Sequence, residues 1–135
     1  MNFNGEIVFT ITDDNPIEVD FGEDMLPTKV INKDDVIVLG MKAPKYRWIY
    51  EIKYNDEQEY IEILEEMLDK LCKRSEYIKE LTAIYDEVDI TIYIRSEFAQ
   101  IGYSLPSHIL EKASSLGCSL HFDILSFGMV VDEEA

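Results

Sequence analysis

The chain has 135 residues, of which 47% are apolar, and its 28 acidic against 12 basic residues give a formal net charge of −16. A chain of this length folds as one domain with its own core. A large negative charge without any basic run argues against binding to nucleic acid or to anionic membranes. The sequence shows neither a basic leader nor an apolar run of the about 20 residues that span a bilayer, so we expect a cytoplasmic protein.

The N-terminal part predicts one strand followed by an irregular segment. Residues 6–12 alternate Ile7, Phe9 and Ile11 with other side chains, which is the two-residue period of a strand. The Asp-Asp-Asn-Pro run at residues 13–16 is typical of a turn and ends this strand. Residues 16–35 follow no clear period, and the sequence leaves open whether they form a short helix.

Two further strands are expected before the first long helix. Residues 36–39 and 46–54 are apolar or alternating, and Gly40 with Pro44 fits a hairpin between them. In the second strand three aromatic side chains share one face: Tyr46, Trp48 and Tyr50. We assign Trp48 to the core beneath a helix, with a contact patch on the open face of the sheet as the alternative.

Two helices are predicted next, over residues 56–73 and 75–85. Apolar side chains recur in the first at three- and four-residue spacing and form one stripe: Tyr60, Ile61, Leu64, Met67, Leu68 and Leu71. The opposite side of this helix carries four carboxylates, which we call the acidic ridge: Glu59, Glu62, Glu66 and Asp69. Four like charges at helical spacing repel one another, so the ridge is a candidate surface for a basic partner.

The C-terminal third predicts strand, loop, helix and strand. Residues 88–95 alternate in strand fashion, and a helix follows Pro106, since the first turn tolerates proline. Gly117 suits a left-handed helix cap, and residues 118–124 return to alternation. Beyond residue 127, we expect residues 128–135 to be a frayed acidic tail.

This ending, Leu-Gly-Cys-Ser-Leu-His-Phe-Asp-Ile at residues 116–124, resembles that of the bacterial "domain of unknown function 4279" family. The resemblance covers about residues 5–126 and also involves Trp48 and the helix at residues 56–73. It implies a fold but no activity. Together with the element order, it indicates a single α+β domain over residues 1–127. We expect a mixed, mostly antiparallel sheet of about five strands with helices packed on one face.

Candidate chemistry is sparse in this sequence. His121 and Asp123 lie two residues apart on one side of the last strand, where they could serve as a base and its orienting carboxylate. A zinc site needs three or four ligands, yet His108 is the only other histidine. Cys72 and Cys118 match no C-x-x-C pattern and are expected to be core residues. Since no phosphate loop or nucleophile elbow occurs, we expect no catalytic, cofactor or metal site.

We therefore expect a non-catalytic protein-binding module, immunity-like or regulatory, whose acidic ridge docks on a basic partner. One alternative is a small-molecule-binding or hydrolytic domain on the open sheet face near His121, with Asp123, Tyr93 and Arg95. Another is a structural domain that forms a homodimer through an exposed strand edge.

Overall fold

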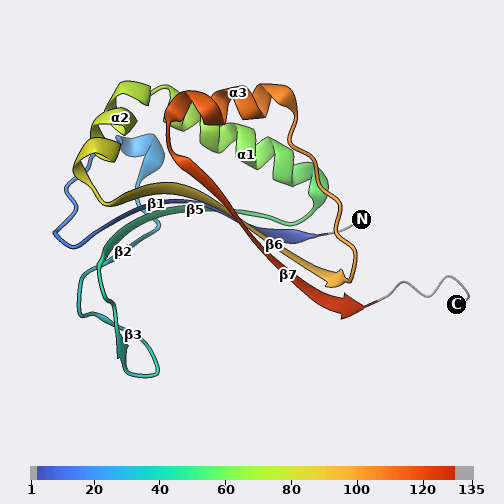
Figure 1. Cartoon of the computed structure of the whole chain (residues 1–135), viewed down its shortest axis with the longest axis horizontal. Coiled ribbons are helices and arrows are strands. Elements are labelled where there is room, and N and C mark those ends of the chain that lie inside the picture. Colours follow the sequence, from blue (N-terminus) through green and yellow to red (C-terminus); the bar gives the residue numbers. More distant parts are fainter. Residues whose placement is uncertain (1–2, 130–135) are drawn as a thin grey trace, which may run out of the picture.

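The computed structural model describes residues 3–129 of the chain, and its main sheet has the strand order β2-β5-β1-β6-β7 (Figure 1). Neighbouring strands are antiparallel except β6 and β7, which are parallel. The bounds of these strands are β1 (Asn4–Asp13), β2 (Lys29–Ile31), β5 (Tyr46–Tyr54), β6 (Glu87–Phe98) and β7 (Ser119–Met129). The predicted mixed, mostly antiparallel sheet of about five strands is confirmed.

Helices α1 (Glu57–Cys72), α2 (Ser75–Ile84) and α3 (Ser107–Leu116) all cover one face of this sheet, as predicted (Figure 1). The boundaries follow local chemistry. The Asp56 carboxylate accepts the N–H of Glu59 at the start of α1. Gly117 ends α3 with a φ of 73°, a left-handed conformation that glycine adopts without steric cost.

The core lies between the helices and the inward face of the sheet. It combines alternate residues of β1 and β6, such as Phe9 and Ile92, with the apolar stripe of α1 centred on Leu64. Trp48 is only 5% exposed and lies 4.9 Å, ring centre to ring centre, from Phe21. The assignment of Trp48 to the core is confirmed.

Tyr54 fixes the packing at the other end of the sheet. Its hydroxyl donates a 2.6 Å hydrogen bond to the carbonyl of Tyr93, passing over Gly5 of the intervening strand β1. A Cβ atom at Gly5 would lie 1.8 Å from that carbonyl oxygen. A side chain is therefore excluded at position 5, where only glycine leaves room for this bond.

The predicted hairpin between residues 36–39 and 46–54 is wrong. Strand β3 (Val36–Val38) pairs with β4 (Met41–Lys42) in a separate two-stranded sheet. Strand β5 cannot take β3 as a neighbour, because β1 and β2 occupy its two edges. Residues 16–35 contain β2 and one turn of 3-10 helix, η1 (Glu23–Met25).

The C-terminal strand continues further than expected. β7 extends to Met129, past residue 127, where the sequence placed the end of the domain. The rest of the predicted acidic tail, residues 130–135, lies outside the described residues.

Candidate functional site

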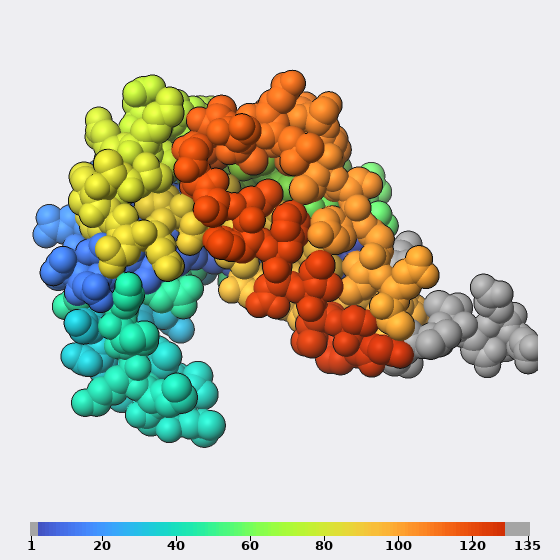
Figure 2. Space-filling view, viewed as in Figure 1, coloured from blue at the N-terminus to red at the C-terminus, as the bar shows by residue number. Residues whose placement is uncertain are grey.

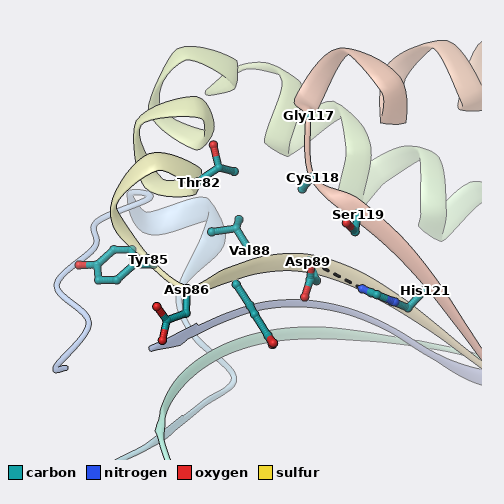
Figure 3. A pocket seen from close by; sticks show the side chains of 10 residues that line it. Thr82, Tyr85, Asp86, Val88, Asp89, Gly117, Cys118, Ser119 and His121 are labelled. Atoms are coloured by element: carbon teal, nitrogen blue, oxygen red, sulfur yellow. Dashed lines mark ion pairs between the residues drawn. The ribbon is translucent and has the colours of Figure 1, made fainter. Parts of the chain in front are cut away.

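A cleft of about 360 Å³ opens between the end of α2, the start of β6 and the turn from α3 into β7 (Figure 3). Its lining is largely polar: Thr82, Tyr85, Asp86, Glu87, Val88, Asp89, Gly117, Cys118, Ser119 and His121. Three of these residues carry carboxylates, of which Asp86 lies 3.3 Å from the Lys45 ammonium, and Figure 3 shows the imidazole of His121 pointing toward Asp89.

His121 lies within reach of an acidic side chain on the neighbouring strand. Its Nε2 is 3.6 Å from a carboxylate oxygen of Asp89 on β6 (Figure 3). His121 and Asp123 share the open face of the sheet as predicted, since residues two apart in a strand point the same way. Asp123, however, is aligned with Tyr93 and does not line the cleft. The carboxylate beside the imidazole is therefore Asp89, which sequence spacing does not reveal.

The other two residues of the expected open-face site are engaged elsewhere or lie outside the cleft. Arg95 makes a two-pronged contact with the Glu6 carboxylate on β1, and this pairing raises the pKa of the guanidinium. Tyr93 lies two residues before it and uses its carbonyl to accept from Tyr54. The cleft therefore includes His121 but not Tyr93, Arg95 or Asp123.

The acidic ridge lies along one exposed side of α1, beside a groove of about 390 Å³ that is also lined by Glu65, Lys70 and Lys73. Glu59 and Asp69, at the two ends of the ridge, already have partners within the chain. Glu59 accepts the N–H of Asn55 at 2.7 Å and so belongs to the helix cap. Asp69 lies 2.7 Å from the ammonium of Lys112 on α3.

The middle of the ridge is the part open to a partner. Glu66 is exposed and lies 3.5 Å from Lys70 one turn later, a pair weakened by water. Glu62 is exposed and has no ion-pair partner among the residues the structure describes. Glu65 was not predicted to belong to the acidic ridge, although it continues the ridge at helical spacing. It lies 2.8 Å from His108 and 3.3 Å from Lys112, which ties α1 to α3.

A second surface is apolar and was not anticipated. The β3–β4 hairpin projects away from the sheet (Figures 1 and 2), and it exposes Val36, Ile37, Val38, Leu39 and Met41. Leu39 at its tip is 97% exposed. The available signal was the unbroken apolar run of residues 36–39, since a two-stranded ribbon alone cannot bury both of its faces.

The family model "Domain of unknown function (DUF4279)" matches residues 3–127 of the chain. The protein belongs to this family. No curated protein and no solved structure matches it. The resemblance stated from the sequence is thereby confirmed.

The chemistry available to this DUF4279 domain in the cleft is limited by the state of Cys118. Burial raises the pKa of its thiol to about 11, so the reactive thiolate is scarce at neutral pH. Within residues 3–129, no three His, Cys, Asp or Glu side chains converge closely enough to hold a metal ion. The same residues include no helix long and apolar enough to cross a membrane.

Proposed function

We propose that this DUF4279 domain is a non-catalytic protein-binding module of the cytoplasm that docks on a basic partner, as an immunity or regulatory protein would. The observation that carries the proposal is the exposed centre of the acidic ridge on α1. Glu62 and Glu66 lie there on a chain whose net charge is −16. Complementary charge speeds encounter with a basic surface and disfavours acidic competitors.

The ends of the ridge support this role by holding its centre in place. Lys112 contacts both Glu65 and Asp69, so α3 anchors the C-terminal half of the ridge. Hydrogen bonding to Asp69 raises the pKa of Lys112 and keeps that ammonium charged. A preorganised surface loses less conformational entropy on binding. A lysine or arginine of the partner would lie in the groove beside Glu62 and Glu66.

The test is the double variant Glu62→Lys, Glu66→Lys. Glu59 and Asp69 are left in place, because they hold α1 at its cap and against α3. Proteins captured on the immobilised native chain from lysate of its own host would be purified, and their association rates measured at two salt concentrations. We expect the double variant to associate at least about tenfold more slowly, with a weaker dependence on salt.

The matched control is Glu76→Lys, Glu80→Lys on α2, which changes the net charge by the same amount at exposed positions. The control variant should associate nearly as fast as the native chain. Equal slowing of both variants would show that only the overall charge matters. Unchanged association of the ridge variant would place the contact surface elsewhere.

A second candidate function is supported by the cleft beside His121. Its volume and the acidic residues in its lining suit a small cationic ligand, such as an amine or a guanidinium compound, next to the His121–Asp89 pair. A thermal-shift screen of such compounds would compare the native chain with Asp89→Asn. A compound that stabilises the native chain alone would favour this function, and equal responses would count against it.

A further inference from the structure

Strand β7 forms one edge of the main sheet, with β6 on its inner side and no strand of residues 3–129 on its outer side. The strand is eleven residues long, and Figure 2 shows it running uncovered across the viewed face. Its exposed side chains include four large apolar ones: Phe122, Ile124, Leu125 and Phe127. A long apolar edge of this kind presents unpaired backbone N–H and C=O groups as a template for another strand.

The usual protections of an edge strand are missing along most of β7. It contains no lysine and no proline, and its only carboxylate is Asp123. The ladder with β6 becomes irregular only at the far end, near Phe98 and Met129, where Gly128 has a φ of 75°. Regular pairing on the outer edge is therefore open from Ser119 to about Ser126.

The sequence of β7 selects a register for pairing with its own copy. Directly opposed residues of antiparallel strands point to the same face, so a two-fold pairing must place one residue opposite itself. Centring on Asp123 would oppose two carboxylates, and centring on His121 would oppose two imidazoles. Facing carboxylates destabilise a sheet, and neither of these two registers places His121 opposite Asp123. Centring on Phe122 instead places His121 opposite Asp123 of the second copy, and it does so twice.

The same register also matches the apolar side chains. Leu120 would face Ile124 of the second copy, and the two Phe122 rings would meet at the centre. All three side chains lie on the helix-covered face, because they align with Ile90, Ile92 and Ile94 of β6. Phe122 already stacks on Tyr103 at 5.4 Å between ring centres, which adds a second aromatic ring to the seam from each copy.

We propose that the partner of β7 is a second copy of this chain, bound through antiparallel β7–β7 pairing centred on Phe122. The contact would join the two five-stranded sheets into one continuous sheet, with the complementary His121–Asp123 pairs on its open face. This dimer does not depend on the acidic ridge, which lies on α1. The two associations also differ in their response to salt. Screening relieves repulsion between two copies that each carry −16, so the dimer tightens with salt, whereas docking on a basic partner weakens.

Sedimentation velocity of the full chain tests the proposal over about 1 to 200 µM, a range that covers micromolar self-association. We expect a species of twice the 15.7 kDa chain mass whose population grows with protein concentration and with salt. His121→Glu would oppose two pairs of carboxylates and weaken the dimer about tenfold. Adding Asp123→Lys to that variant would restore complementary pairs and recover most of the affinity.

Two controls make the outcome specific. Leu39→Lys alters the exposed tip of the β3–β4 hairpin and should leave the dimer unchanged. His121→Glu also places a carboxylate near Asp89 of its own chain, so its thermal midpoint must be measured. Should that variant unfold, Asp123→Lys alone removes both cross-chain pairs without touching Asp89, and it should weaken the dimer.

Three results would overturn the proposal. The first is a chain that stays monomeric over the whole concentration range, even at high salt. The second is a dimer that tolerates the β7 substitutions or is dissolved by Leu39→Lys, which would locate the interface elsewhere. The third is an open-ended series of larger oligomers, because a two-fold β7–β7 contact closes at two copies.

Discussion

Among single residues, Asp13 links two distant parts of the sheet. It ends β1 with a nearly buried side chain, and its two carboxylate oxygens accept different backbone N–H groups. One bond of 3.0 Å comes from Asn15 in the following turn, and the other of 2.8 Å comes from Asp86 just before β6. Both hydrogen bonds stabilise the charged carboxylate and therefore lower the pKa of Asp13. The bond from Asn15 has the larger effect.

The lowered pKa makes this contribution to stability dependent on pH. An unfolded aspartate titrates near about 3.9, so the stabilisation is fully present above that pH. It is lost as the pH falls through the lower pKa of the folded state. Asp13→Asn keeps the size of the side chain but retains only one acceptor oxygen. We expect Asp13→Asn to have a lower free energy of unfolding than the native chain. The difference should be largest at neutral pH and should shrink in acid.

Urea unfolding of both chains at about pH 7, 5 and 3 would measure this deficit across the relevant titration range. Asp14→Asn is the matched control, since its carboxylate is exposed and contacts only Lys45 at 3.9 Å among the described residues. It should show little change at any pH. A deficit of Asp13→Asn that stays constant with pH would mean that shape, and not charge, matters at this position.

Among the elements, α1 shows how one helix can combine a structural end with an open surface. At its start the Asp56 carboxylate accepts the N–H of Glu59 at 2.9 Å. The Glu59 carboxylate in turn accepts the N–H of Asn55. This exchange is close to a capping box, in which two otherwise unpaired donors are satisfied. Glu62, one turn further on, takes no part in it.

We therefore expect Glu59 and Glu62 to differ in their effect on stability. Glu59→Ala should lower the free energy of unfolding by about 0.5–1.5 kcal/mol, the usual net value of one hydrogen bond. Glu62→Ala should change it by less than about 0.5 kcal/mol, as an exposed position outside the cap. Denaturant unfolding of both variants compares them directly. If both substitutions lowered the free energy of unfolding equally, the capping hydrogen bond of Glu59 would add nothing to stability beyond the effect of its surface charge.

The length of each helix or strand explains whether it could be predicted from the sequence. Elements such as α1, β1 and α3 were predictable because a long element must bury one face, and that requirement imposes its period on the residues. The short strand β2 was not, because its place depends on an edge of β5 that exists only in the folded sheet. The cap of α1 was readable from residue type, with Asn55 or Asp56 as the candidates, and Asp56 takes this role. The Asp89 partner of His121 was not readable, since it follows from the β6–β7 register.

At the scale of the whole molecule, 12 basic residues are set against 28 acidic ones, and some basic side chains contact two carboxylates each. Lys112 contacts both Glu65 and Asp69, and Lys45 contacts both Asp14 and Asp86. Such exposed pairs contribute little individually. The surplus negative charge therefore remains on the surface of a small domain, where it opposes compaction.

Salt should stabilise this protein for that reason. Screening weakens the favourable pairs and the unfavourable repulsion alike, but the repulsion involves more charges and acts over longer distances. We expect the thermal midpoint to rise by a few degrees between about 10 and 500 mM sodium chloride, where 1 kcal/mol corresponds to about 4 °C. The Glu62→Lys, Glu66→Lys variant carries less negative charge and should gain less from the same salt.

Two comparisons separate repulsion within one chain from the proposed dimer. Repulsion within one chain is independent of protein concentration, whereas stabilisation by association grows with it. The salt-dependent rise should therefore persist in dilute protein and in the His121→Glu variant, in which the proposed β7–β7 contact is about tenfold weaker. Sucrose, which does not screen charge, should not reproduce the difference between the native chain and the Glu62→Lys, Glu66→Lys variant. A midpoint that stays flat or falls with salt in dilute protein would mean that the surface carboxylates lie too far apart to repel one another.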